Sequence, residues 1–91
     1  MKLERFIQLD YDSSKSLAVM GKNQKAKLAS KFFKERGIDF HIVDLENLHQ
    51  FGELIDPQVL VAVYPAQIVR NGIVDLLHGF GLDIGRDCWW I

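Results

Sequence analysis

Thiol and imidazole groups are the most versatile chemical groups in a protein, and this chain holds few of them. It has one cysteine, Cys88, and three histidines, His41, His49 and His78. The histidine spacing matches no compact metal-ligand pattern, and one thiol is too few for the usual cysteine-rich zinc sites. We therefore expect no metal and no cofactor, and we assign no catalytic residue.

Cys88 itself can be interpreted in two ways. It follows Asp87 and precedes two tryptophans, and Arg86 is the one cation nearby in the sequence. A reactive thiol needs cationic neighbours that lower its pKa. This setting favours a buried or incidental cysteine, and a thiol- or glutathione-linked activity through Cys88 is the alternative.

Basic residues are concentrated in one part of the chain. Between Lys15 and Arg36 there are seven basic residues and one acidic residue, although the whole chain has a net charge of −1. The candidate partner-binding lysines of this segment are Lys22, Lys25, Lys27, Lys31 and Lys34. Such a surface is either a solvated helix face or a docking site for an acidic protein partner or for nucleic acid.

The sequence ends in Trp89-Trp90-Ile91, an unusual aromatic cluster. Tryptophans of this kind dominate hot spots in protein–protein interfaces. They can equally fold back and complete the core of a small domain. Trp89 and Trp90 are therefore candidate partner-binding residues, with a core role as the other interpretation.

Length and composition bound the class of protein. The 91 residues, of which 48% are apolar, predict a single domain over 1–91 with a real core. No apolar run approaches the roughly 18 residues that span a bilayer, and residues 1–5 do not resemble a signal peptide. One cysteine fits a reducing compartment, so we expect a cytoplasmic protein that does not bind membranes.

Apolar periodicity predicts the elements of the first half. A strand is expected over 5–9 and turn chemistry over 10–16. A helix is expected to begin at an Asn23 N-cap and to end before Gly37. Its apolar stripe consists of Ala26, Leu28, Ala29, Phe32 and Phe33.

The second half alternates between short apolar runs and breakers. Alternating apolar residues predict a strand over 38–43, and a short helix is expected over 44–55. The β-branched run 58–64 is typical of a central strand. Strands over 67–70 and 73–74 are expected to flank an Asn71-Gly72 hairpin turn, followed by a helical turn over 76–80 and turn residues from 83.

The predicted order is β-α-β-α-β-β-α, which is the layout of the thioredoxin fold, a four-stranded mixed sheet flanked by helices. Three segments also resemble the glutaredoxin family. They are Lys25-Ala26-Lys27 followed by Gly37-Ile38-Asp39-Phe40-His41-Ile42-Val43-Asp44-Leu45, then Val63-Tyr64-Pro65-Ala66-Gln67-Ile68-Val69-Arg70-Asn71-Gly72, and more weakly His78-Gly79-Phe80. Together they cover roughly residues 5 to 80 in the family's order.

The chain departs from this family where its chemistry resides. Aligned on Ala26-Lys27, the family's Cys-Pro-x-Cys falls on Met20-Gly21-Lys22-Asn23. Glutaredoxin chemistry needs a thiolate at a helix N-terminus. No cysteine occurs before position 88, so a dithiol or monothiol reaction at this place is excluded.

The resemblance also implies a ligand groove. Pro65 would be the cis-proline that presents its neighbouring backbone groups to glutathione or an extended peptide. The groove residues implied are Met20, Gly21 and Lys22 on one side and Tyr64, Pro65 and Ala66 on the other. Retention of Pro65 for folding alone is the other interpretation.

These observations favour a non-enzymatic protein-interaction module on a redox-inactive glutaredoxin-like domain. Its compact size and the Tyr11-Asp12-Ser13 segment resemble bacteriophage glutaredoxins, so a phage or mobile-element protein that binds a host protein is one form of this hypothesis. The alternatives are nucleic-acid binding through the basic helix and an activity linked to Cys88.

Overall fold

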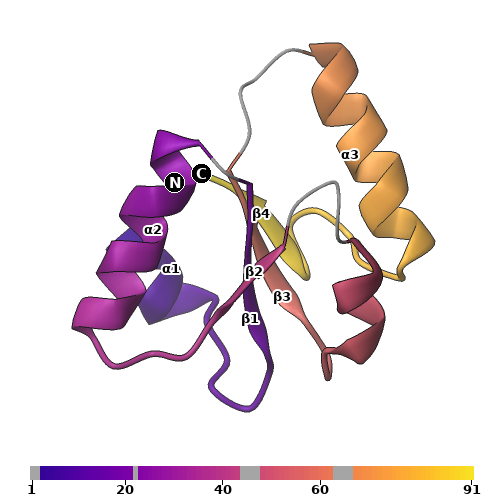
Figure 1. Ribbon diagram of the computed structural model, residues 1–91. Helices are drawn as coiled ribbons and strands as arrows, with labels where there is room; N and C mark the ends of the chain where they lie inside the picture. The colour runs from indigo at the N-terminus through magenta and orange to yellow at the C-terminus, as the bar shows by residue number, and fades with distance from the viewer. Residues whose placement is uncertain (1–2, 22, 44–47, 63–66) are drawn as a thin grey trace.

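A four-stranded sheet lies at the centre of the molecule, and all of its strand pairs are parallel (Figure 1). The strands, in the spatial order β2-β1-β3-β4, are β1 (Leu17–Met20), β2 (His41–Val43), β3 (Gln58–Val61) and β4 (Cys88–Trp90). The structure is a computed structural model that describes residues 3–21, 23–43, 48–62 and 67–91, with the backbone alone at 48–49 and 67–70.

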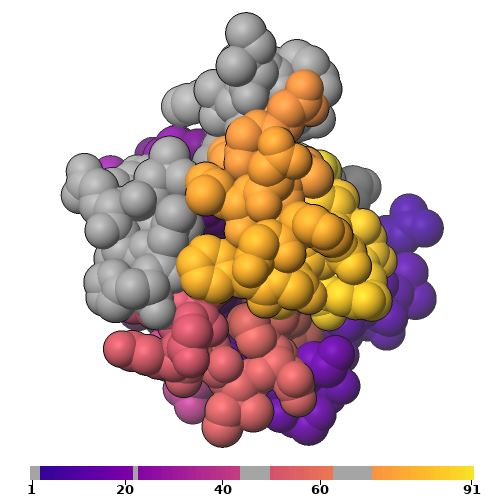
Figure 2. Space-filling model, turned by 90° about the vertical axis from the view of Figure 1, so that its right-hand side faces the viewer, coloured from indigo at the N-terminus to yellow at the C-terminus, as the bar shows by residue number. Residues whose placement is uncertain are grey.

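Helices cover both faces of this sheet. The helical elements are α1 (Leu3–Leu9), α2 (Gln24–Glu35), the 3₁₀ helix η1 (Leu48–Glu53) and α3 (Gln67–Gly79). α1 and α2 pack on one face, while η1 and α3 pack on the other, and Figure 2 shows α3 crossing that second face with η1 below it. No helix in the described segments combines the length and the apolar character needed to cross a bilayer.

Alternation along the strands divides the core in two. β1 sends Leu17 and Val19 towards α1 and α2, and it sends Ala18 and Met20 towards α3. All four side chains are buried, as expected for a central strand of a parallel sheet with both faces covered.

α2 confirms its predicted start and stop but only part of its predicted stripe, because Leu28 is exposed. The Asn23 side chain accepts a hydrogen bond from the Ala26 N–H at 3.0 Å, so it is the N-cap. Ala26, Ala29 and Phe33 are buried against the sheet. Gly37 has a φ of +67° and donates its N–H to the Lys34 carbonyl, which ends the helix in a left-handed turn.

The predicted turn at 10–16 and the predicted strand beginning at 58 are joined by one buried side chain. Gln58, buried at the start of β3, accepts from the Asp12 N–H at 3.0 Å and donates to the Asp12 carbonyl at 2.7 Å. The Asp12 carboxylate in turn accepts from the Ser14 N–H and hydroxyl. The segment before β1 is therefore an ordered turn, as its composition predicts.

The predicted first strand over 5–9 is wrong, because this segment belongs to α1. Leu3, Phe6 and Ile7 recur three and four residues apart and pack into one core, which is helical spacing. The first strand is instead β1, an apolar run for which no element is predicted. It follows the turn at 10–16 and is the strand that pairs with both β2 and β3.

The predicted hairpin at Asn71-Gly72 is also wrong, together with its flanking strands over 67–70 and 73–74. These residues lie inside α3, where Ile73 and Leu77 are buried one helical turn apart. The expected helical turn over 76–80 overlaps the end of the same helix, whose last residue is Gly79. A two-residue hairpin joins antiparallel strands, whereas α3 is the crossover that a parallel β3–β4 pair requires.

The sheet is therefore all-parallel, and the mixed sheet of the thioredoxin type is a wrong expectation for this chain. The last strand is β4, formed by the aromatic segment that follows the predicted turn residues. The coarser expectation, an α/β domain with four strands and flanking helices, is confirmed.

The remaining expectations hold in part. The strand expected over 38–43 is shorter, as β2, and the helix expected over 44–55 contains η1. The run 58–64 begins as predicted with β3. Residues 44–47 and 63–66, which include Pro65 and its expected cis bond, lie outside the described residues.

Gly72→Ala distinguishes a helix from a hairpin at this position. A Cβ at Gly72 would have open space around it, and alanine is favoured over glycine in a helix interior. We expect the free energy of unfolding to rise by about 0.5–1 kcal/mol in urea denaturation. In a two-residue hairpin turn the same change would be destabilising, because position 72 would need a positive φ. A loss of stability would therefore contradict α3.

Candidate functional site

The strand order reverses between β1 and β3. From β1 the chain runs out to β2, returns past β1 to β3, and continues outward to β4. In open parallel sheets with helices on both faces, ligands bind in the crevice beyond the carboxyl ends of the two strands where the order reverses. Here those ends are Met20-Gly21 and Val61-Ala62.

Direct contacts join these two strand ends. Gly21 has a φ of +134°, and a Cβ at this position would clash with the Ala62 carbonyl oxygen. That same oxygen accepts a hydrogen bond of 2.7 Å from the Asn23 side-chain amide. The Ala62 N–H donates to the Met20 carbonyl. The described part of the crevice is therefore packed by the protein's own groups.

The expected ligand groove falls on this crevice, and one of its residues is placed in the core. The Met20 side chain is 1% exposed and packs under α3, so it offers no surface to a ligand. Gly21 is half-buried. Lys22, Tyr64, Pro65 and Ala66 lie outside the described residues, so the groove around Pro65 stays a prediction.

The predicted basic face of α2 divides into two sides. Lys27, Lys31 and Lys34 are exposed and follow each other at four and three residues, which places them in one row on the helix. Lys25 lies on another side of α2, where its Nζ donates to the backbone oxygen of Ile91 at 3.2 Å. Lys22 is outside the described residues.

The lysine row borders a hollow of about 540 Å³ between α2 and β2, which we call the α2–β2 groove. Its lining consists of Gly21, Ala26, Lys27, Ser30, Lys31, Lys34, Glu35 and Ile42. Ile42 is 52% exposed although it belongs to a strand. The groove therefore combines an apolar wall with three cations and a single acid.

Sequence reasoning found the lysines of this groove but not the groove itself. Helical spacing puts Lys27, Lys31 and Lys34 on one side of α2, and this could be read from the sequence. The exposure of Ile42 could not be read from the sequence, because it depends on β2 being an outer strand of the described sheet. Glu35 lies 3.9 Å from Lys31 in an exposed ion pair, so it reduces the local positive charge without removing it.

Both C-terminal tryptophans are half-buried and pack on opposite faces of β4. Trp89 contacts Phe6 of α1 with the ring centroids 5.1 Å apart, whereas Trp90 packs against the core beneath α3. This arrangement gives both residues a structural role. Their expected role as partner-binding anchors stays a prediction.

Cys88 is fully buried at the start of β4. Burial, reinforced by the charges of Asp87 and Asp83, raises the pKa of the Cys88 thiol to about 12, although the Arg86 charge acts in the opposite direction. The thiolate, which is the reactive form, is therefore scarce near neutral pH. The geometry disfavours an activity through Cys88.

The histidines lie apart from one another where their side chains are described. His41 is exposed on β2, and His78 lies at the end of α3. Within the described residues, no group of three or more histidine, cysteine, aspartate or glutamate side chains is arranged to hold a metal ion.

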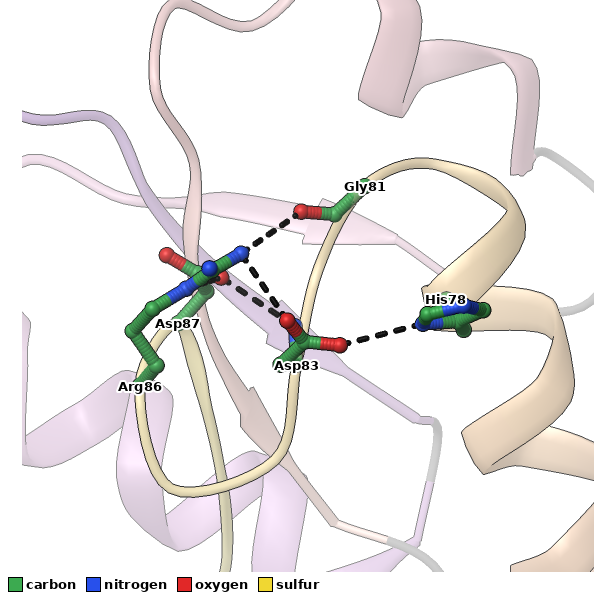
Figure 3. Close-up of polar contacts among 5 residues, drawn as sticks. All are labelled: His78, Gly81, Asp83, Arg86 and Asp87. Carbon is green, nitrogen blue, oxygen red and sulfur yellow. Dashed lines mark hydrogen bonds and ion pairs between the residues drawn. The ribbon is translucent and has the colours of Figure 1, made fainter.

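A network of charged groups joins the end of α3 to the start of β4 (Figure 3). Arg86 lies between two carboxylates, 3.1 Å from Asp83 Oδ2 and 2.8 Å from Asp87 Oδ2. It also donates to the Gly81 carbonyl, and His78 Nδ1 lies 3.0 Å from Asp83 Oδ1. These bonds stabilise the turn that precedes β4, the strand at the other edge of the sheet.

Asp87 is the most buried carboxylate of this network, with 15% of its side chain exposed. Burial alone would raise the pKa of Asp87. The hydrogen bond from the Asp83 N–H and the Arg86 guanidinium outweigh burial, so the pKa of Asp87 lies below its ordinary value of 3.8. The charged carboxylate is therefore part of the stable turn.

Comparisons with protein-family models, with curated proteins and with solved structures found no significant match for this chain. A function is therefore inferred from the geometry of the described residues.

Cys88 should react slowly with iodoacetamide in the native protein. At pH 8 we expect alkylation at least about 100-fold slower than in urea-unfolded chain, because the thiol is buried and its pKa is raised. Mass spectrometry over time measures both rates. Equal rates would show that Cys88 is accessible and would return it to the candidate reactive residues.

Asp87→Asn should lower stability in a pH-dependent way. A carboxylate whose pKa is depressed in the folded state stabilises that state above its unfolded pKa, and this contribution is lost as the pH falls through the folded value. We expect a loss of about 1 kcal/mol at pH 7 that diminishes progressively below pH 3.8. Urea denaturation across this range measures it.

Asp75→Asn is the matched control, since it removes the same charge from an exposed position on α3. A loss of stability in Asp87→Asn that stayed constant down to the lowest pH would contradict the role of the Asp87 charge.

Proposed function

We propose that this chain is a non-enzymatic protein-interaction module that binds an acidic segment of a protein partner in the α2–β2 groove. The observation that carries the proposal is the row of Lys27, Lys31 and Lys34 beside an apolar hollow at the edge of the sheet. An acidic segment with some apolar surface matches both properties of this place.

The apolar part of the groove supports a binding role. Ile42 is half exposed on a strand, and Ala26, although buried, reaches the lining of the hollow. Covering such a surface with a partner removes apolar area from water, which favours a complex by about 25 cal/mol per Å² before the entropic costs of association are subtracted. The lysine row above it would select carboxylates and speed the encounter.

A protein partner fits these charges better than nucleic acid. Three lysines line the groove together with Glu35, and the chain as a whole has a net charge of −1. Binding driven by phosphates depends on many cationic contacts and benefits from a basic surface overall. A small number of cations around an apolar hollow instead suits an acidic peptide segment.

An enzymatic role has little support from the described residues. The buried Cys88 is the single thiol of the chain. The two positions that align with the glutaredoxin dithiol hold Met20 and Asn23. Met20 is in the core, and Asn23 is occupied as a helix cap and as a donor to Ala62. The redox-inactive part of the hypothesis is therefore retained, although the scaffold is a parallel sheet.

Charge reversal of the lysine row tests the proposal. The probes are two blocked eight-residue peptides of four glutamates and four threonines, one alternating and one with the residues in pairs. We expect at least one to bind the native chain weakly, with NMR shifts at α2 and β2. Lys27→Glu/Lys31→Glu/Lys34→Glu should weaken that binding at least about tenfold in roughly 150 mM salt, because each exposed ion pair contributes ~0.2–1 kcal/mol and reversal adds repulsion.

The matched control is Arg5→Glu/Lys15→Glu/Lys25→Glu, which gives the same net charge from exposed positions outside the groove. At this salt concentration distant charges are largely screened, so the control should bind as the native chain does. Equal losses in both variants, or no binding of either peptide, would overturn the proposal. A single-stranded oligonucleotide that bound the same lysines more tightly would overturn it in favour of nucleic acid.

A further inference from the structure

β2 is the outer strand on one side of the sheet. Among the described residues it pairs with β1 alone, in the register Ala18↔His41, Val19↔Ile42 and Met20↔Val43. A strand at a sheet edge presents backbone N–H and C=O groups on its outer side, and those groups can pair with another chain. In Figure 1 the β2 ribbon passes in front of β1.

The edge at β2 has a hollow on each face of the sheet. The α2–β2 groove is one of them. The second has a volume of about 450 Å³ and lies between β2 and η1, so we call it the β2–η1 hollow. Its lining consists of Phe40, His41, Ile42, Gln50, Glu53 and Leu54. Ile42 borders both hollows, which places β2 between them.

Side chains of β2 point alternately towards these two sides. Ile42 is paired with Val19, whose side chain packs in the core under α1 and α2, so Ile42 faces the α2 side. Val43 is buried in the core under η1 and α3, so His41 faces that other side. A strand added beside β2 would follow the same alternation.

We propose that the acidic segment binds as an additional strand along the outer edge of β2, with its side chains entering the α2–β2 groove and the β2–η1 hollow in turn. This inference rests on the proposed function and specifies how the partner is held. Main-chain hydrogen bonds to β2 supply part of the affinity, and the two hollows supply specificity, as in other cases of strand addition.

The two hollows select different side chains. On the α2 side, carboxylates of the partner face Lys27, Lys31 and Lys34. On the η1 side, Glu53 and Gln50 lie in the lining, so a carboxylate there would meet like charge. The partner sequence that fits is an extended run in which acidic residues alternate with neutral polar residues such as threonine, which also favours strands.

The two Glu/Thr peptides separate this binding mode from the function itself. Both have the same composition and charge, but only the alternating peptide can direct all its carboxylates to one face of a strand. We expect it to bind at least about fivefold more tightly than the paired peptide and to slow amide exchange within β2. Equal binding of the two peptides would overturn strand addition while leaving the acidic-segment function intact.

Backbone N-methylation then tests the main-chain hydrogen bonds. In an added strand, alternate N–H groups point to the sheet and the others point away. Because the carboxylates must face α2, the register is fixed. Methylation of one alternate set should therefore reduce binding at least about tenfold, and methylation of the other set should be tolerated. Two methylated peptides that both bind like the parent would overturn the proposal.

A second copy of the chain could also occupy the edge at β2. Sedimentation of the native chain, at the concentration used for the titrations, distinguishes this case. We expect a monomer whose edge is open to the peptide. A dimer that dissociates when the alternating peptide is added would show that the edge serves self-association, and it would overturn the proposal.

Discussion

The Ala62 carbonyl oxygen is the point on which the arrangement of the molecule depends. It accepts the Asn23 amide, and Gly21 lies so close to it that no side chain fits there. Asn23 also caps α2, so one side chain joins the end of β3 to the first turn of the helix that follows β1. This contact sets the direction in which α2 leaves the sheet. The lysine row and the α2–β2 groove lie where they do because α2 starts from this fixed point.

The two sides of the sheet use different means to hold its outer strands. On the β4 side, aromatic packing and the Arg86 carboxylate network fix the strand, with Trp89 against Phe6. On the β2 side, the described strand has three residues, two of them exposed. Natural proteins protect an edge with charges or with short strands, and the lysines of α2 beside β2 fit that pattern. Under the proposed function, the same features also make this edge selective for an acidic segment.

The sequence allowed some elements to be predicted, and the reasons differ from one element to another. α2 was predictable because its cap at Asn23, its apolar stripe and its Gly37 stop are all local signals. The strand at 5–9 was wrong because five residues are too few to separate a helical period from an alternating one. Asn71-Gly72 is a local turn signal, but the segment is helical because a helix buries Ile73 and Leu77 against the sheet. This burial is available only once the sheet has formed, so the local sequence does not reveal it. The α2–β2 groove could not be predicted from the sequence for the same reason, because Ile42 and α2 come together only in the tertiary structure.

The parallel order of the sheet also determines how the chain can reach it. Ala18 pairs with His41 on one side and with Val59 on the other. Each of these pairings therefore joins residues that are far apart in the sequence. Before two such strands can pair, the chain between them must close into a long loop. This closure costs conformational entropy before the strand contacts form. Folding through such non-local contacts is slow compared with that of a helical bundle of equal size. In any partly folded species that lacks β3, the edge of β1 that pairs with β3 is open, and an open strand edge is prone to misassociate.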